Sequence, residues 1–431
     1  MAMTGTVGSL SQEGAGSPLD KGLGRRAPDG AGAGTSGPGW NLLREEVSLP
    51  VAVLHQEVMA RNLEWMQRFT AAYAVQLAPH GKTTMAPALF ARQLKAGAWG
   101  ITLATAAQCR VAHAHGVRRV LLANQLVGAQ NCELVSALLA DPGFSFACLV
   151  DSAANAEALG RFFAARGQRL EVLLELGTLG GRAGVRDEAQ QEELLGTLAR
   201  WPQVLALVGV ETYEGVLKDE AAVRALLRRT VAVLRALSAR GLFARRPPLL
   251  SGAGSAWYDV VAEEFAPGAV GVPCEVVLRP GCYLTHDVGI YRSAQAQLFA
   301  RSATARALGP GLEPALQLWA YVQSRPEAEL AIIGLGKRDA AFDAGLPVPC
   351  RHYRPGGASP VASPRAVPAG WRLTKMMDQH AFMAVEAGDD VAVGDMVSFD
   401  ISHPCLTCDK WRNLLVIDAD HRVIEVLPTY F

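Results

Sequence analysis

The sequence predicts a (β/α)8 barrel followed by a second, mostly β domain. Two observations indicate this fold class. From about residue 50 to 290, short apolar runs alternate with amphipathic helical segments, and beyond that point short strand-like runs dominate. Such alternation is typical of βαβ units and a parallel sheet, and about eight units fit a closed barrel. A doubly wound sheet is the alternative, but no Gly-x-Gly-x-x-Gly follows the first strand-like run to support it.

The strand-like runs of the predicted barrel are short and rich in apolar or β-branched residues. They lie near Val51–Leu54, Ala74–Ala78, Gly100–Ala104, Arg119–Ala123, Phe144–Val150, Leu170–Leu176, Leu205–Glu211, Pro248–Ser251 and Glu275–Leu278. Helical segments separate most of these runs, and the clearest helix covers Ala221–Leu242. We therefore place the barrel at residues 43–290.

Beyond residue 290 the helical periodicity fades. The strand-like runs there include Leu316–Val322, Glu329–Gly334, Asp395–Ile401 and Leu414–Ile417, and Pro347–Gly357 is interpreted as turns. This pattern predicts a β domain over residues 291–431. At the other end, residues 1–42 are rich in Gly, Ala and Ser. They can bury too little surface to offset the entropy of ordering, so we expect a disordered tail.

The charge of the chain excludes some classes of partner. The 431 residues contain 41 basic and 41 acidic side chains. A neutral balance predicts no binding of nucleic acid or of an anionic membrane, so we expect a small ligand. The sequence shows neither a membrane span nor a secretory signal. Its eight cysteines are scattered rather than arranged as a disulfide framework, which favours a reduced, cytoplasmic protein.

Lys82 is the first candidate for chemistry. It lies in Pro79–Thr84 (PHGKTT), directly after the second strand-like run. Active sites of barrels are built where strands end, and a desolvated lysine there can form a Schiff base. The alternative interpretation is an ordinary surface lysine in a turn.

Two loops that follow strand-like runs are candidates for cofactor binding. Small residues in Ser251–Ser255 (SGAGS) would let backbone N–H groups approach a phosphate, although a plain strand-to-helix turn has the same composition. Gly177–Gly184 (GTLGGRAG) contains Arg182, which could point into the mouth of the barrel or simply be solvated.

His403 and Cys405 form a candidate metal site in the β domain. We expect them to alternate along an extended segment, so that both side chains face one way. Imidazole and thiolate together suit zinc. Cys405 and Cys408 could instead be half of a structural Cys-x-x-Cys site, but the chain has no second such pair. A buried cysteine without a ligand is the remaining alternative.

The order of these motifs resembles the D-serine dehydratase / D-threonine aldolase family, including its "amino acid deaminase" subgroup. These are fold-type III pyridoxal-phosphate enzymes related to alanine racemase. The resemblance runs from about residue 45 to the C-terminus. It rests on Pro79–Thr84, the Arg182 loop, Tyr213 in Glu211–Gly215 (ETYEG), the Gly252–Ser255 turn and the His403-x-Cys405 pair.

The resemblance implies a role for each matched residue. Lys82 would bind pyridoxal 5'-phosphate covalently, and Gly252, Gly254 and Ser255 would bind its phosphate. Tyr213 would line the cofactor pocket, and Arg182 would lie near the pyridine nitrogen. His403 and Cys405 would hold Zn²⁺ or another divalent metal. Two further residues are carried over: His380 near the metal and substrate, and Tyr283 near the phosphate. The Gly-rich N-terminal tail has no counterpart in the family.

The resemblance also implies a reaction. Lys82, once freed, would accept the α-proton, and a metal on the β-hydroxyl would help hydroxide to leave. Cys405 favours this dehydratase, because in the family His-x-Cys goes with dehydratases and His-x-Asp with aldolases. The expected substrate is a D-3-hydroxy amino acid such as D-serine or D-threonine, converted to a 2-oxo acid and ammonia. Relatives pair head to tail, so we expect a homodimer.

Three alternatives remain. A metal-dependent D-threonine-type aldolase would release glycine and an aldehyde. An isomerase of the alanine racemase type would need a second base and no metal, and the His403/Cys405 pair argues against it. A non-catalytic pyridoxal-phosphate-binding protein would typically lack the β domain.

Overall fold

The computed structural model describes residues 20–24, 38–356 and 363–431. Most of the predicted tail lies outside these ranges. The described parts of residues 1–42 differ from the expected disorder, because they pack on the rest of the chain. Leu23 and Leu42 are buried, and Gly24 forms a β-bridge with Val47.

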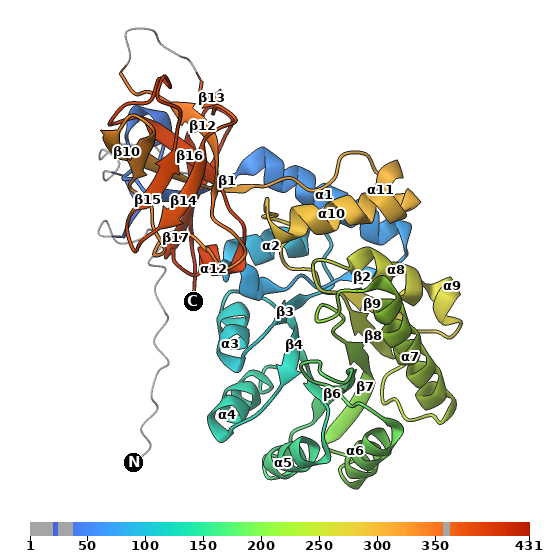
Figure 1. Cartoon of the computed structure of the whole chain (residues 1–431). Coiled ribbons are helices and arrows are strands. Elements are labelled where there is room, and N and C mark those ends of the chain that lie inside the picture. Colours follow the sequence, from blue (N-terminus) through green and yellow to red (C-terminus); the bar gives the residue numbers. More distant parts are fainter. Residues whose placement is uncertain (1–19, 25–37, 357–362) are drawn as a thin grey trace, which may run out of the picture.

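In the described part of the chain, eight parallel strands form the predicted barrel (Figure 1). They are β2 (Gln76–Leu77), β3 (Ile101–Leu103), β4 (Arg119–Gln125), β5 (Ser145–Val150), β6 (Leu170–Leu176), β7 (Leu205–Thr212), β8 (Leu249–Gly252) and β9 (Glu275–Leu278). The strand order runs from β2 through β9 and down to β3. A parallel bridge between His80 and Thr102 joins the two ends of this order. The sheet is therefore closed, which excludes the doubly wound alternative.

Apolar side chains explain why these segments form buried strands. The β7 strand is buried along its whole length, as expected for a strand covered on both faces. A separate cluster of small and branched side chains, among them Ala147, Leu173, Val208 and Val277, belongs to alternate positions of the barrel strands. Because all the strands run in one direction, their C-terminal ends meet at one rim of the barrel.

Helices with one apolar face cover the barrel. They are α1 (Gln56–Ala72), α2 (Pro87–Lys95), α3 (Ala106–Ala114), α4 (Ala129–Leu138), α5 (Ala153–Ala164), α6 (Glu188–Arg200), α7 (Glu220–Ala239), α8 (Tyr258–Phe265) and α9 (Pro267–Val270). The α7 helix starts where the side chain of Asp219 accepts a hydrogen bond from the Ala222 N–H, a typical N-cap.

The helical layer does not end at residue 290 as predicted. Two more helices follow, α10 (Ile290–Arg301) and α11 (Ala303–Ala307). Arg301 of α10 forms an ion pair with the buried Asp259 of α8 at 2.6 Å, which fixes α10 against the barrel. The β domain therefore begins closer to Leu316.

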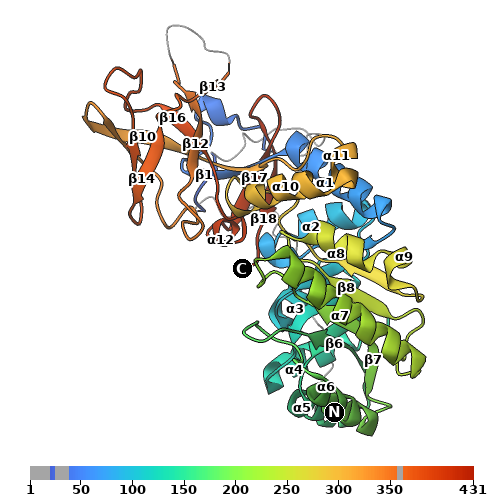
Figure 2. The same cartoon turned by 45° about the vertical axis from the view of Figure 1, so that its right-hand side comes forward.

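The second domain is mostly β, as predicted, but it also includes the first strand of the chain. Its strands are β1 (Val51–His55), β10 (Leu316–Glu327), β11 (Leu330–Ile333), β12 (Val348–Tyr353), β13 (Arg365–Ala366), β14 (Arg372–Met376), β15 (Ala381–Ala384), β16 (Met396–Asp400), β17 (Asn413–Ile417) and β18 (Val423–Pro428). β1 lies between β10, to which it is antiparallel, and β17, to which it is parallel. Figure 2 shows β1 among these strands and away from the barrel.

The placement of β1 corrects the predicted start of the barrel at residue 43. An apolar run at the start of the chain looks the same whether it pairs inside a barrel or inside another sheet. A second correction concerns Pro347–Gly357, which we interpreted as turns although residues 348–353 form β12. None of the helices in the described ranges has the length and apolarity of a membrane span.

Candidate active site

A cleft of about 610 Å³ opens where the C-terminal ends of the barrel strands face the β domain. This volume lies in the usual range for sites that bind small molecules. Both domains contribute side chains. Seven of the predicted site residues line the cleft, namely Lys82, Arg182, Tyr213, Gly254, Ser255, His403 and Cys405.

Lys82 projects into the cleft from a single turn of 3-10 helix, Gly81–Thr83 (η2), that follows β2. The backbone must pass close to α2 here, because a Cβ on Gly81 would lie 2.8 Å from the ring of Phe90. Among the described residues, no carboxylate forms a salt bridge with the Lys82 ammonium group. The amine is thus held at the cleft by a rigid turn and has no competing acidic partner there.

His80 lies beside Lys82 and also lines the cleft. Burial lowers the pKa of His80 well below its ordinary value, and the nearby cations of Lys82 and Arg279 lower it further. The imidazole is therefore neutral. Its Nδ1 atom is buried and has no hydrogen-bond partner within the described residues. An orphaned polar atom in a cleft wall is a sign that a bound group completes the site.

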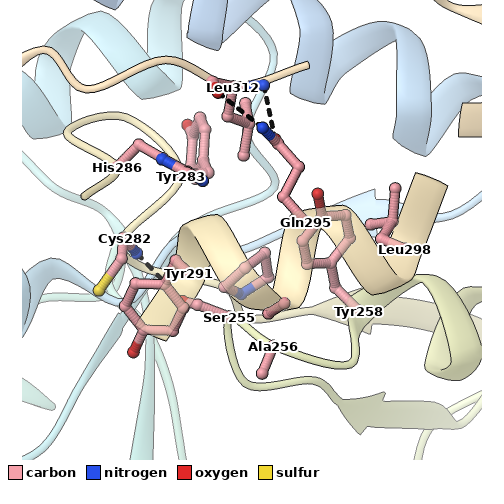
Figure 3. Close-up of a pocket in the computed structure, with 12 residues that line it drawn as sticks. Ser255, Ala256, Tyr258, Cys282, Tyr283, His286, Tyr291, Gln295, Leu298 and Leu312 are labelled. Carbon is pink, nitrogen blue, oxygen red and sulfur yellow. Dashed lines mark hydrogen bonds between the residues drawn. The ribbon is translucent and has the colours of Figure 1, made fainter. Parts of the chain in front are cut away.

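Ser255 is the centre of a polar cradle at one end of the cleft. Its hydroxyl oxygen accepts hydrogen bonds from the backbone N–H groups of Gly281 and Cys282, both at 3.1 Å. Figure 3 shows the bond between Ser255 and Cys282. The backbone of Gly281 is tightly enclosed, since a Cβ there would lie 2.6 Å from the His80 carbonyl oxygen. The Ser255 hydroxyl, oriented by these two bonds, can donate its own proton to an anion such as a phosphate.

The two glycines predicted to bind phosphate have other contacts in this structure. The N–H of Gly254 donates to the buried carboxylate of Glu214 at 2.7 Å, and Ala253 N–H donates to the same carboxylate at 3.2 Å. Gly252 is buried at the end of β8 and does not line the cleft. Of the three predicted phosphate ligands, Ser255 therefore has the most suitable surroundings.

The floor of the cleft carries a charged group that the sequence analysis did not assign. Arg279, directly after β9, forms a buried ion pair with Glu211 and donates to the Ser251 hydroxyl at 3.0 Å. Arg182, expected near the pyridine nitrogen of the cofactor, lines the cleft and is exposed, and its guanidinium lies over the Tyr213 ring, 4.6 Å from its centroid. Arg279 was not predicted as a site residue, although Tyr283, four positions later in the chain, was.

His403 and Cys405 come together in the part of the cleft wall that the β domain contributes. The segment between them is not extended as predicted, because Pro404 and Cys405 begin the short helix α12 (Cys405–Cys408). The two side chains nevertheless line the same part of the cleft. The nearby Cys405 sulfur and Asp343 raise the pKa of His403 to about 9. The Cys405 pKa falls to about 4, through contacts with Cys282, His403 and Thr83.

A carboxylate orients the imidazole of this pair. Asp343 Oδ2 lies 2.8 Å from His403 Nδ1, which leaves the other ring nitrogen free to act as a ligand. Histidines that bind metals usually have such a partner. Asp343 could not be predicted, because nothing in the sequence links it to a histidine 60 positions away. Over the described ranges, no group of three or more His, Cys, Asp or Glu side chains forms a ready-made metal site.

Besides Gly252, two predicted site residues are not in the cleft. Tyr283 is 1% exposed, and its hydroxyl accepts a hydrogen bond from Gln93 at 3.1 Å. It faces the small cavity behind the cradle that is drawn in Figure 3. His380 is exposed in the turn between β14 and β15 and does not line the cleft.

Two family models match the chain. Residues 54–272 match the alanine racemase N-terminal domain, and residues 315–417 match the putative serine dehydratase domain. The matched ranges coincide with the barrel and with most of the β domain.

Individual proteins are similar to parts of the chain. A D-threonine aldolase of Arthrobacter sp is 27% identical over 317 residues, which is 72% of this chain and 76% of that protein. A D-threo-3-hydroxyaspartate dehydratase of Delftia sp. (strain HT23) is 36% identical over 137 residues, which is 32% of this chain and 35% of that protein. The match thus spans about a third of that dehydratase.

Solved structures share the fold. The D-threonine aldolase from Filomicrobium marinum superposes with a TM-score of 0.73 at 24% identity, covering 91% of this chain and 97% of that chain. The structure of the Delftia dehydratase gives a TM-score of 0.69 at 25% identity, covering 90% of this chain and 99% of that chain.

Proposed function

Because the chain belongs to the alanine-racemase-like family of pyridoxal-phosphate enzymes that contains D-serine dehydratases and D-threonine aldolases, we propose that it is a pyridoxal-phosphate- and zinc-dependent dehydratase. Its substrate would be a D-3-hydroxy amino acid, which it converts to a 2-oxo acid and ammonia. One observation carries the proposal: Lys82 and the His403/Cys405 pair line the same cleft from two domains.

The residues present fit pyridoxal phosphate. Lys82 Nζ would hold the cofactor at its aldehyde carbon. Ser255, whose hydroxyl is oriented by the N–H groups of Gly281 and Cys282, would donate to the phosphate. Tyr213 would line the cofactor pocket. These assignments are supported by the unpartnered lysine and by the cradle at Ser255.

The His403/Cys405 pair fits a divalent metal. A deprotonated Cys405 and a neutral His403 would both be ligands, and Asp343 would keep the His403 ring in place. Zinc suits a thiolate and an imidazole better than Mg²⁺ or Mn²⁺ do, because a thiolate is a soft ligand. This supports Zn²⁺ as the metal.

When bound, the cofactor would stabilise the negative charge left at Cα, and the metal would act as a Lewis acid toward the β-hydroxyl. The amine of Lys82 would accept the α-proton, because it faces the cleft without an acidic partner. His403 and Cys405 would place the hydroxyl for departure at the part of the cleft wall that the β domain contributes. Closure by both domains would limit the access of water.

A metal-dependent aldolase is the second candidate. It is favoured by the larger share of the chain that matches the Arthrobacter aldolase, 72% against 32% for the dehydratase. The thiolate at position 405 supports the dehydratase, because family aldolases carry His-x-Asp at the metal pair. The homodimer and the cytoplasmic location expected from the sequence stay predictions.

Replacement of Lys82 tests the cofactor site. Purified protein should show the visible absorption band of a lysine-bound cofactor, and Lys82→Ala should abolish this band because the covalent attachment is lost. Lys337→Ala, a change at a lysine outside the cleft, should keep the band. A wild-type protein without the band would contradict the central proposal.

Product analysis tests the reaction. D-Serine and D-threonine should yield pyruvate and 2-oxobutyrate with equimolar ammonia, and a chelator should lower the rate. Glycine and acetaldehyde from D-threonine, without a 2-oxo acid, would decide for the aldolase.

Cys405→Ala should lower the zinc content of the protein, while the absorption band of the cofactor stays.

A further inference from the structure

A second cysteine lies against the proposed metal pair. The sulfur of Cys282 is 3.6 Å from the sulfur of Cys405, and both contact the Thr83 hydroxyl, at 3.8 and 3.5 Å. Cys282 comes from the barrel, four positions after the end of β9, whereas Cys405 comes from the β domain. The two thiols therefore contact each other where the barrel and the β domain meet.

The Cys282 side chain is directed to this point by its backbone. The N–H of Cys282 is bound to Ser255, and the preceding Gly281 is enclosed by His80 and Thr83. In Figure 3 the Cys282 sulfur points away from the small cavity behind the cradle. Cys282 also lines the main cleft, together with Cys405 and His403. The thiol is thus available to a group bound there.

The separation of the two sulfurs matches that of two ligands of one zinc ion. Two sulfurs bound at about 2.3 Å and at the tetrahedral angle lie about 3.8 Å apart. The observed 3.6 Å is within a few tenths of an ångström of this value. A thiol hydrogen-bonded to a thiolate gives a similar distance, so a test must count the sulfurs bound to the metal.

We propose that Cys282 is a third protein ligand of the metal, with His403 and Cys405. The inference rests on the metal site of the proposed function and extends it. In the described residues the three donors do not yet converge on one point, so binding would draw Cys282 toward the other two and release its thiol proton. Three ligands leave one tetrahedral position for the substrate hydroxyl, which is the arrangement of catalytic zinc sites.

This ligand set has consequences for metal choice. Two thiolates select zinc or another thiophilic metal, and they exclude Mg²⁺ and Mn²⁺, which take oxygen ligands. A metal held by Cys282 and Cys405 would also tie the barrel to the β domain. The metal would then contribute to the contact between the domains as well as to the reaction.

X-ray absorption at the zinc edge of the full-length, zinc-loaded protein tests the proposal. The wild type should show two sulfur neighbours, and Cys282→Ser should show one. Because a direct ligand is lost, the zinc affinity of Cys282→Ser, measured by competition with a chromophoric chelator, should fall at least ~10-fold. Cys274→Ser, the same change at the other end of β9, should leave both readouts as in the wild type.

The outcomes separate this inference from the proposed function. One sulfur neighbour in the wild type, with unchanged affinity in Cys282→Ser, would overturn the third ligand and keep the His403/Cys405 site. A wild type that binds no zinc would overturn the metal site itself. If Cys282→Ser fails to fold, the sulfur count of the wild type decides alone, and Cys282→Ala provides a second variant.

Discussion

At the scale of single residues, His286 makes the protein sensitive to acid. It is 3% exposed, and burial lowers its pKa from 6.5 to about 4. The unfolded chain therefore takes up a proton at higher pH than the folded chain does. This one group should leave the free energy of unfolding unchanged above pH 6.5 and should lower it by up to about 3 kcal/mol as the pH falls from 6.5 to 4.

His286→Asn should make the dependence of unfolding free energy on pH less steep, because one of the titrating groups is gone. Asparagine suits the backbone there, which has φ of 46°. The measurement is the slope of unfolding free energy against pH. His380→Asn, at an exposed position, should keep the wild-type slope, and an equally steep slope in both variants would contradict the prediction.

Site residues next to a recognisable motif could be predicted from the sequence, whereas their partners could not. Lys82, Ser255, His403 and Cys405 belong to short motifs, and the structure places all four in the cleft. Asp343 and Cys282 enter the site only through contacts 60 and 123 positions apart along the chain. No local pattern reports such contacts, because they depend on how the two domains pack.

At the scale of elements, two glycines in neighbouring helices have opposite surroundings. Gly160 in α5 is buried, and a Cβ there would lie 2.5 Å from the ring of Trp201. Trp201 is held by a 3.0 Å hydrogen bond from its indole N–H to Glu157, so it has little freedom to move. Gly196 in α6 is exposed and has nothing within 4 Å of the corresponding position.

Alanine at these positions should act in opposite directions. Gly160→Ala should lower the unfolding free energy by about 1–3 kcal/mol, because the ring must shift. Gly196→Ala should raise it by up to about 1 kcal/mol, since alanine favours a helix. Urea unfolding midpoints measure both. Equal shifts in the same direction would show that packing at Trp201 is not the cause.

Elements with a strong hydrophobic pattern were predicted from the sequence. Short elements that depend on a few residues were not. Each predicted barrel strand overlaps a strand of the structure, because apolar runs of this kind are stable only when they are buried. The α12 helix was missed because a four-residue turn has no periodicity. The hydrogen bond from Thr407 Oγ1 to the His403 carbonyl oxygen stabilises the helical turn that begins at Pro404.

At the scale of the whole molecule, β1 makes the two domains interdependent. It forms four residue pairs with β10 and three with β17 in the interior of the second sheet. A fragment of residues 291–431 alone lacks this strand, so two inner strand edges would be left open. We expect this fragment to be unfolded or insoluble.

Restoring β1 should rescue the second domain. His55 N–H bonds to the Ala315 carbonyl at 2.9 Å, so residues 38–55 can be joined to residues 310–431 through a short Gly/Ser linker. This chain should give the circular dichroism of a β protein and a cooperative thermal transition. The same chain with Val53→Asp is the control, because a charge in the middle of β1 should abolish the transition. A cooperative transition in the fragment without β1 would contradict the prediction.

The predicted fold class was right, but the first strand of the predicted barrel belongs to the β domain. Periodicity indicates that a segment is a strand and says nothing about its partner. The barrel and the β domain both needed an apolar strand, and only the pairing of β1 with β10 and β17 decides between them.

The position of β1 also determines when this strand can pair during synthesis on the ribosome. β1 is made early, but its first partner begins about 260 residues later, at Leu316. At ~5–20 residues per second, β1 waits for roughly 13–50 s, and longer for β17. During that time its apolar side chains must be shielded by the growing barrel or by a chaperone. A nascent chain stalled before residue 316 should therefore be bound by chaperones through β1, even when its barrel has already closed.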